Sequence, residues 1–278
     1  MPVQSTTVHP RVAFLGGGNM ARALVQGLLR EGWPAGQLRV GEPAEAARAA
    51  LASLGVAAGD DNAAAIAGAR LVVLAVKPQQ AAAVLGPLAP ALRDSGAALL
   101  SIAAGLQIAG LERTCPGVPI VRAMPNRPAL IGLGAAALHA PAALDPAVRA
   151  LAGRVLAASG STVWVPRESD LDVVTALSGS GPAYFFQLAE HMAAAATAQG
   201  LEPATAMQLA VATLQGAGAL AATGGTLAEE RAAVTSKGGT TEAALAAFAA
   251  GGFASLVAGA LDAATRRSRE LAAQVAAG

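Results

Sequence analysis

The sequence predicts an α/β protein whose N-terminal part is a doubly wound sheet and whose C-terminal part is entirely helical. Three observations lead to this prediction. Short apolar runs alternate with helical segments over the first 165 residues, no convincing strand follows residue 170, and a glycine-rich turn links the first strand to a helix. Such alternation is typical of a parallel sheet covered by helices. We therefore expect one domain over residues 1–166 and a second over residues 167–278.

The expected strands are short and mostly apolar, and they lie at residues 12–15, 38–40, 71–76, 98–102, 120–121, 135–138 and 162–165. The run 71–76 is apolar throughout, which indicates a strand buried on both faces of the sheet. Alanine-rich helical segments over 21–30, 44–54 and 79–92 separate several of these strands.

The second part reads as alanine-rich helices punctuated by glycine, proline and serine, at residues 178–182, 200, 224–225, 238–239 and 251–252. These helices carry few charges. Helices that are apolar on more than one side bury part of that surface against a partner, so we expect a homodimer.

Composition excludes several classes of protein. The 278 residues are 54% hydrophobic and 13% charged with a net charge of +1, which argues against disorder and against a nucleic-acid or membrane partner. Cys115 is the one cysteine, so neither an internal disulfide nor a cysteine-rich metal site is expected. The polar first ten residues do not resemble an export signal, and we expect a cytoplasmic protein. The uncharged runs 203–228 and 243–261 favour buried helices over membrane spans, because polar residues interrupt the first and Gly251-Gly252 breaks the second.

The glycine-rich turn has the pattern Gly16-x-Gly18-x-x-Ala21 between the first strand and the first helix. In such a turn the first glycine allows the tight bend, the second lets a pyrophosphate approach the main chain, and the small third residue permits close packing of helix on strand. The helix N-terminus then faces the phosphates. The pattern in this context predicts a Rossmann-like dinucleotide site, with a ligand-free turn as the alternative.

Two further side chains follow strands at the edge where open α/β sheets bind ligands. Glu42 ends the second strand, where an acidic residue accepts hydrogen bonds from the ribose hydroxyls of NAD, or is simply a solvated glutamate. Lys77 follows the buried run 71–76 and is one of two lysines in a chain with seventeen arginines. It either faces a ligand or lies on the surface.

Three more motifs combine unusual residue types. In Val121-Arg-Ala-Met-Pro-Asn-Arg-Pro128 the two prolines stiffen the loop at a strand end and present Asn126, and Met124 is either an apolar wall or plain core. The stretch 175–184 reads as a helix interrupted for close packing and restarted at Pro182. The stretch 233–245 contains Lys237, two glycines and a Thr-Thr-Glu helix start, whose main-chain N–H groups suit a carboxylate or phosphate. A capped helix start is the alternative for this last motif.

Taken together these motifs resemble Δ1-pyrroline-5-carboxylate reductase, the family that reduces a cyclic imine to L-proline. The matching segments occur in the family's order and span nearly the whole chain: Leu15-Gly-Gly-Gly-Asn-Met-Ala21, Ala75-Val-Lys-Pro-Gln79, Arg122-Ala-Met-Pro-Asn126, Leu177-Ser-Gly-Ser-Gly-Pro-Ala-Tyr184 and Val234-Thr-Ser-Lys-Gly-Gly-Thr-Thr241. The last two are highly specific to the family, whereas the first is shared with many dehydrogenases.

The resemblance implies a Rossmann-like domain that binds NADPH or NADH and a helical domain that dimerises by interleaving, with dimers able to assemble as a ring of five. It places the substrate carboxylate on the N–H groups around Gly238, Gly239 and Thr240, assisted by Ser236, and gives Thr241 the catalytic contact to the ring nitrogen. The residues expected at the cofactor are Gly16, Gly18, Asn19, Met20, Glu42, Asn62, Ala75, Lys77, Pro78 and Asn126. A protonated imine is already electrophilic, so positioning and exclusion of water suffice without a strong general acid.

Two positions depart from the family. Arg127 stands where the family usually has threonine, and Glu42 stands where a small or basic residue often accompanies NADPH. Asn62 corresponds to a family position near the adenosine phosphate and favours NADPH, so the choice between the two cofactors stays open.

Two other functions compete with this interpretation. A β-hydroxyacid dehydrogenase of similar architecture uses a lysine on the long helix that opens its second domain, and residues 175–199 contain none. A non-catalytic dinucleotide sensor has no need of the motif from Ser236 to Thr241. The chain shows no metal-ligand spacing, and His9, His139 and His191 lie in unrelated contexts.

Overall fold

The structure, a computed structural model, describes residues 9–277, with side chains as far as residue 276. The chain forms two compact units. Residues up to Gly179 and from Ala264 onward form the first, and Ser180–Ala263 form the second. This break differs from the division expected at residue 166, because α8 (Asp170–Val174) packs on the sheet and the chain's last helix returns to the first unit. The functional division at 166 stays a prediction.

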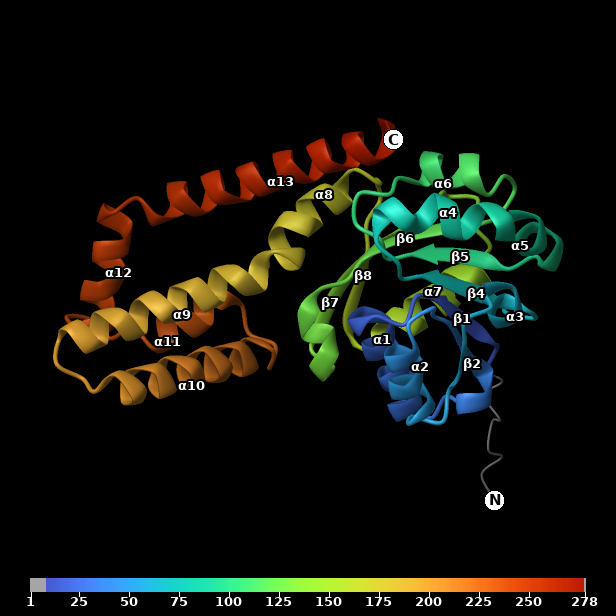
Figure 1. Cartoon of the computed structure of the whole chain (residues 1–278). Coiled ribbons are helices and arrows are strands. Elements are labelled where there is room, and N and C mark those ends of the chain that lie inside the picture. Colours follow the sequence, from blue (N-terminus) through green and yellow to red (C-terminus); the bar gives the residue numbers. More distant parts are fainter. Residues whose placement is uncertain (1–8, 278) are drawn as a thin grey trace, which may run out of the picture. The chain divides into compact units, whose positions relative to one another are not determined.

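The first unit is built on an eight-stranded sheet in the order β3-β2-β1-β4-β5-β6-β7-β8 (Figure 1). The strands are β1 (Val12–Leu15), β2 (Leu38–Gly41), β3 (Ala57–Gly59), β4 (Leu71–Leu74), β5 (Ala98–Ser101), β6 (Ile120–Met124), β7 (Gly134–His139) and β8 (Gly160–Trp164). The seven expected strands are present. The extra strand, β3, has the sequence Ala-Ala-Gly at the exposed sheet edge, and such residues give no β signal.

The sheet is parallel from β3 to β6, as expected, but β7 runs antiparallel to β6 and β8 runs parallel to β7. The expectation of a parallel sheet is therefore wrong for its last two strands. Only residues 125–133 lie between β6 and β7. A parallel crossover needs about a dozen or more residues, so this short connection reverses the chain direction.

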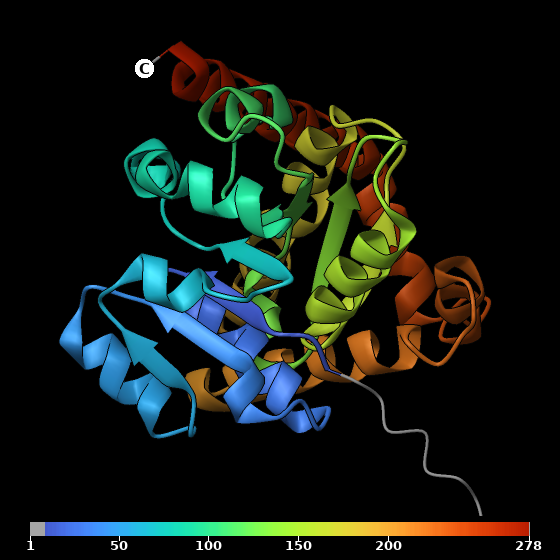
Figure 2. The ribbon, with the colours of Figure 1, turned by 90° about the vertical axis from the view of Figure 1, so that its right-hand side faces the viewer.

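Helices cover both faces of the sheet (Figures 1 and 2). They are α1 (Asn19–Arg30), α2 (Glu45–Ala52), α3 (Asn62–Ile66), α4 (Ala81–Leu85), α5 (Ala89–Ser95), α6 (Ile108–Thr114) and α7 (Pro146–Ala157), with short 3₁₀ turns η1 (Ala35–Gln37), η2 (Pro78–Gln80), η3 (Gly86–Leu88) and η4 (Arg127–Ile131). One core joins Leu28 of α1 to Val155 of α7, and the other joins Leu85 of α4 to Leu111 of α6. The central strands β1, β4 and β5 are buried along their whole length, as expected for a doubly wound sheet.

The helix predicted over 79–92 is divided into η2, α4, η3 and α5. Prolines lie in the first turns of η2, η3 and α5. Proline lacks the N–H that a continuous helix needs at interior positions, so each one starts a new turn.

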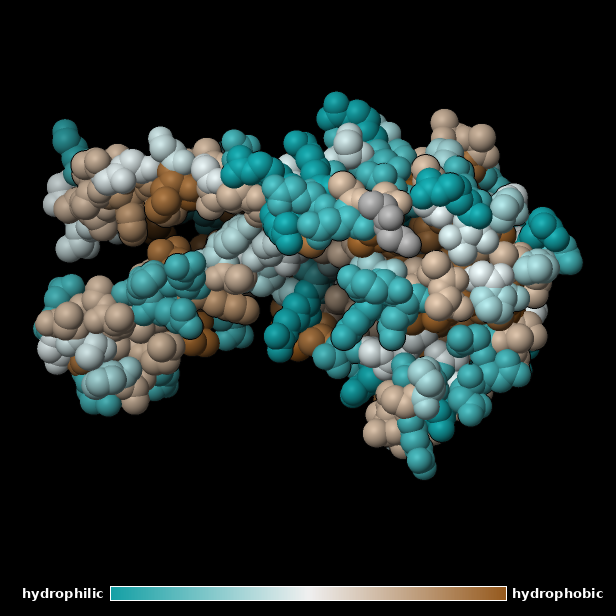
Figure 3. Space-filling view, turned by 45° about the horizontal axis from the view of Figure 1, so that its top comes forward, coloured by the Kyte–Doolittle hydropathy of each residue, from teal (hydrophilic) through white to brown (hydrophobic). Residues whose placement is uncertain are grey.

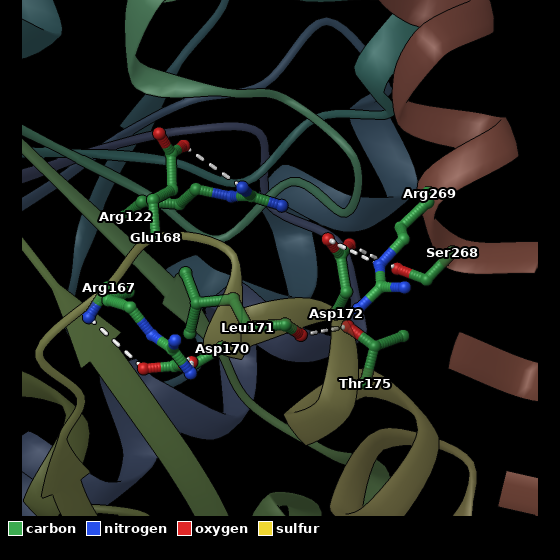
Figure 4. Close-up of polar contacts among 9 residues, drawn as sticks. All are labelled: Arg122, Arg167, Glu168, Asp170, Leu171, Asp172, Thr175, Ser268 and Arg269. Carbon is green, nitrogen blue, oxygen red and sulfur yellow. Dashed lines mark hydrogen bonds and ion pairs between the residues drawn. The ribbon is translucent and has the colours of Figure 1, made fainter. Parts of the chain in front are cut away.

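Buried polar contacts hold α8 and the end of the chain in the first unit (Figure 4). Arg122 of β6 pairs with Glu168 at 3.0 Å, and its side chain is only 6% exposed. Asp172 of α8 accepts a 2.7 Å hydrogen bond from Ser268 and lies 4.0 Å from Arg269. Both partners of Asp172 belong to the last part of α13 (Phe253–Ala277). These contacts link α8 to α13, and Asp172 and Ser268 are 96 residues apart in the chain.

Helix α8 continues into a π-helical turn, η5 (Thr175–Gly179). Arg167 donates a hydrogen bond to Asp170 at the start of α8 and thereby lowers the pKa of that carboxyl. The Thr175 hydroxyl donates to the Leu171 carbonyl at 2.7 Å. The helix α9 (Gly181–Ala198) then begins with Pro182 in its first turn, which confirms the predicted interruption and restart.

The second unit consists of helices only, as the sequence predicts for this segment: α9, α10 (Pro203–Ala221), α11 (Leu227–Ala233), α12 (Thr240–Ala250) and the first part of α13. Its own core is small and made of alanines, namely Ala189, Ala193, Ala206 and Ala210. Large apolar side chains remain on its surface, among them Phe185 at 60% and Leu256 at 71% exposure. Brown, apolar patches mark these helices in Figure 3.

Among the described residues no single helix is long and apolar enough to cross a membrane. Taken together, the bent pair α12 and α13 has the length and apolar composition of a span. These two helices meet at a 56° bend. The bend falls at Gly251–Gly252, the break that the sequence predicts, and Gly252 has a φ of +73°.

Candidate functional site

The glycine turn between β1 and α1 has the geometry that the pattern predicts. Gly16 adopts a φ of +96°, and a Cβ there would lie 2.8 Å from the Ala75 carbonyl oxygen. At Gly18 a Cβ would meet nothing within 4 Å, so the main chain is open to an approaching group. Gly18 is also the N-cap of α1, and no side chain caps that helix start. An uncapped start of a twelve-residue helix fits a phosphate group.

The carboxyl ends of β1, β2 and β4 lie in register, so their loops meet at one edge of the sheet. Glu42 follows β2, and its carboxylate accepts a 2.6 Å hydrogen bond from the Gly17 N–H. Lys77 is exposed and lies at the start of η2, with Pro78 in the first turn. The structure thus brings four predicted cofactor residues, Gly16, Glu42, Ala75 and Lys77, to this edge. Asn19 and Met20 form the first turn of α1 beside them.

Asn62 begins α3 and lies against the end of β2. A Cβ at Gly41 would overlap Asn62 Oδ1, so the Asn62 side chain lies close against the main chain at this glycine. Asn62 is therefore placed next to Glu42, although its contact with a cofactor stays a prediction.

Asn126 connects elements within the first unit. Its Nδ2 donates to the Ser178 carbonyl at 2.9 Å, and its Oδ1 accepts from the Ala135 N–H at 2.8 Å. Beside it, the Met124 methyl group would lie 2.9 Å from a Cβ at Gly179. The close packing predicted for the 175–184 motif is present here. The Asn126 amide holds the end of β6 against the π-helical turn, and its role as a cofactor contact stays a prediction.

The motif from Ser236 to Thr241 lies in the second unit, at the start of α12. Gly238 has a φ of +73°, and Gly239 is the N-cap of the helix without a side-chain cap. The Gly239 N–H donates to the Ser236 carbonyl at 3.0 Å. The Gly238 N–H donates to Glu242 at 2.6 Å. Two of the N–H groups expected at a bound carboxylate are thus engaged within the loop, and those of Thr240 and Thr241 lie in the first turn of α12.

Sequence reasoning did not single out Glu242 or the Arg122–Glu168 pair. The signal for Glu242 was its place four residues after Gly238, within reach of the turn's N–H. Arg122 was a charged residue inside an otherwise apolar strand, and such a residue requires a buried partner. Arg127, the departure noted in the sequence, lies exposed at the start of η4. No group of three metal-binding side chains occurs in residues 9–277.

Comparisons with known proteins match both units. The pyrroline-5-carboxylate reductase of Pseudomonas aeruginosa is 46% identical to this chain over 269 residues, which cover 96% of the chain and 98% of that protein. This chain belongs to the pyrroline-5-carboxylate reductase family. The Haemophilus influenzae pyrroline-5-carboxylate reductase is 44% identical over 95% of the chain and 98% of that protein. The resemblance seen in the sequence motifs is thereby confirmed.

Within this reductase, residues 168–271 match the pyrroline-5-carboxylate reductase dimerisation family, and residues 11–105 match the family of NADP oxidoreductases that are coenzyme F420-dependent. Solved structures agree. A Coxiella burnetii pyrroline-5-carboxylate reductase superposes with a TM-score of 0.91 at 36% identity, covering 94% of this chain and 98% of that one. A Plasmodium falciparum pyrroline carboxylate reductase with NADP bound superposes with a TM-score of 0.79 at 25% identity, covering 95% of this chain and 98% of that one.

Proposed function

We propose that this chain reduces Δ1-pyrroline-5-carboxylate to L-proline with NADH or NADPH as the reductant. The observation that carries this proposal is the match over nearly the whole chain to curated reductases of that name. The glycine turn supports it, because Gly16 and Gly18 provide the bend and the open approach that a dinucleotide needs. The NADP bound to the Plasmodium relative supports the same class of cofactor.

The bound cofactor supplies the hydride, and the chain's residues have to position and shield the reactants. The proposed cofactor site is the uncapped start of α1 for the pyrophosphate, with Glu42 and Asn62 toward the adenosine and Ala75, Lys77 and Pro78 after β4. No strong acid is needed at the imine, since its protonated form already accepts hydride. Orientation and water exclusion then account for most of the rate acceleration.

The proposed substrate site is the start of α12. A carboxylate is favoured there by the helix dipole and by N–H groups in the first turn, which for this helix are those of Thr240 and Thr241. Ser236 and the Gly238–Gly239 turn hold this shape through the Gly239 N–H bond to the Ser236 carbonyl. The Thr241 hydroxyl, half-buried, is proposed to hydrogen-bond the ring nitrogen.

The activity test compares substrates. Oxidation of NADH or NADPH is followed spectrophotometrically with pyrroline-5-carboxylate and then with β-hydroxyacids. We expect turnover with the imine alone. Cofactor binding without oxidation in any reaction would instead indicate a sensor, and turnover only with a β-hydroxyacid would indicate the related dehydrogenase class.

Thr241→Ala is expected to lower kcat about 100-fold, while the Kd of the cofactor changes less than about twofold, because the lost hydroxyl contacts the reacting ring alone. Steady-state kinetics and calorimetric cofactor titration measure the two quantities. Thr223→Ala is the matched control, since that exposed hydroxyl bonds only the Leu220 carbonyl. Loss of cofactor binding in Thr241→Ala would refute the assignment of this loop to the substrate.

Glu242→Gln is expected to lower the KM for the anionic substrate about threefold and to leave kcat unchanged. The carboxylate bonded to the Gly238 N–H repels a second carboxylate at the same helix start, whereas glutamine keeps the hydrogen bond without the charge. The kinetic comparison is repeated with Glu190→Gln, an exposed carboxylate on α9. A KM that rises in Glu242→Gln would show that this charge assists substrate binding.

We propose that the reductase is a homodimer, with a ring of five dimers as the larger assembly, and that it works in the cytoplasm. The match to a dimerisation family and the exposed apolar side chains of the second unit support the dimer. Light scattering measures the mass of the assembly in solution, and a monomer at micromolar concentration would contradict this part of the proposal.

A further inference from the structure

The carboxylate of Glu42 bridges two main-chain N–H groups. Its Oε2 accepts from Gly17 at 2.6 Å, and its Oε1 accepts from Ala44 at 2.9 Å. The first of these donors belongs to the glycine turn itself. Glu42 is therefore a fixed part of the wall beside that turn, and the alternative of a freely solvated strand-end glutamate does not describe it.

The main chain on either side of Glu42 is held as firmly. The Glu42 N–H donates to the Gly59 carbonyl at 2.8 Å, and the Gly16 N–H donates to the Gly41 carbonyl at 2.8 Å. A Cβ at position 41 would overlap Asn62 Oδ1, so a side chain there requires Asn62 to move. These bonds fix the Glu42 main chain beside the glycine turn in the structure.

Acidic residues outnumber basic ones in the two loops that follow β2 and β3. Asp60 and Asp61 follow directly after Gly59, and Glu45 begins α2; all three are exposed. Arg48 donates hydrogen bonds from its Nη1 to the carbonyls of Glu42 and Pro43, at 2.9 and 2.6 Å. Within the described part of the chain, no ion pair neutralises the Glu42 carboxylate.

We propose that Glu42 makes this reductase selective for NADH over NADPH, an inference that rests on the proposed function. A carboxylate offers about four lone-pair sites, and two of them remain for the ribose hydroxyls after the bonds from Gly17 and Ala44. A 2′-phosphate brings about −1.5 to −2 charges to the same place. It would meet the Glu42 carboxylate at short range, and Arg48 is bonded to main-chain carbonyls and not to that carboxylate.

The test is the Kd of NADH and of NADPH, measured by isothermal titration calorimetry on the intact protein without substrate. We expect the wild type to bind NADH at least about tenfold more tightly than NADPH. Glu42→Gln keeps a side-chain oxygen for the Gly17 N–H and removes the charge. It should bring the ratio of the two Kd values close to one, mainly by lowering the Kd of NADPH. Glu42→Ser is expected to shift the ratio in the same direction. Thermal unfolding of each variant shows that it is folded.

Glu45→Gln is the matched control. It removes the same charge three residues after Glu42, at an exposed position that makes no bond to the glycine turn. Its ratio should stay within about twofold of the wild type. The inference is overturned if the wild type prefers NADPH, if Glu42→Gln leaves the ratio unchanged, or if Glu45→Gln shifts it equally. Failure of both cofactors to bind would instead refute the proposed function.

Discussion

Gly16→Ala is expected to lower both cofactor affinity, by at least about tenfold, and the stability of the first unit. Alanine at a φ of +96° is strained by about 1–3 kcal/mol. Its Cβ would also lie 2.8 Å from the Ala75 carbonyl oxygen and 3.0 Å from Val76 Cγ1. The turn has to move to relieve this contact, which displaces the start of α1. Calorimetric titration with NADH and thermal unfolding measure the two effects.

Gly18→Ala separates binding from folding. A Cβ at position 18 meets no atom within 4 Å, and its φ of −66° suits alanine. We therefore expect unchanged thermal unfolding but a loss of cofactor affinity of about tenfold, because the methyl group occupies the approach to the main chain. Gly36→Ala, in the open turn η1, is the control for both measurements. Unimpaired cofactor binding in Gly16→Ala and Gly18→Ala would show that this turn does not hold the pyrophosphate.

The second large effect is on stability. Arg122→Met is expected to lower the free energy of unfolding by about 2–3 kcal/mol. Loss of one partner from a fully buried pair costs about 3–5 kcal/mol, and the 28% exposure of the Glu168 side chain reduces the cost here. Glu168 keeps its bond from the Ile108 N–H but loses its counter-charge. Urea unfolding at a fixed protein concentration measures the change, since association contributes to apparent stability.

Two further variants distinguish the buried pair from a surface charge. The double variant Arg122→Met/Glu168→Gln should regain part of the loss, because no charge is then left unpaired. Arg93→Met removes an exposed pair with Asp94 and should cost less than about 1 kcal/mol. Equal effects of Arg122→Met and Arg93→Met would mean that burial of the Arg122 pair contributes nothing to stability.

The sequence predicts those parts of the fold that local pattern determines. The strands β1 and β4 are recognisable from their apolar runs. The glycine turn is recognisable as well, because its chemistry is contained in six neighbouring residues. The reversal of β7 and the edge strand β3 escape prediction for different reasons. The first depends on the length of a connection, and the second consists of alanine and glycine paired to β2.

The candidate site is predictable in its residues more than in its contacts. The bond from Gly17 to Glu42 joins residues 25 apart, and the bonds of Asn126 reach Ser178, 52 residues later. Such contacts arise only when strands and loops come together, so residue type and spacing do not reveal them. The contact at α12 differs, because the Gly238 N–H expected at a ligand donates to Glu242 only four residues later, a spacing that the sequence does show.

The course of α13 has a consequence for how the protein is made. Its residues up to Ala263 belong to the helical unit, and those from Ala264 belong to the nucleotide-binding unit, where Ser268 contacts Asp172. The first unit is thus interrupted in the chain by the second. During translation it remains incomplete until α13 has emerged from the ribosome. We expect shortening the C-terminus before Ser268 to impair the unit encoded first, not just the end of the protein.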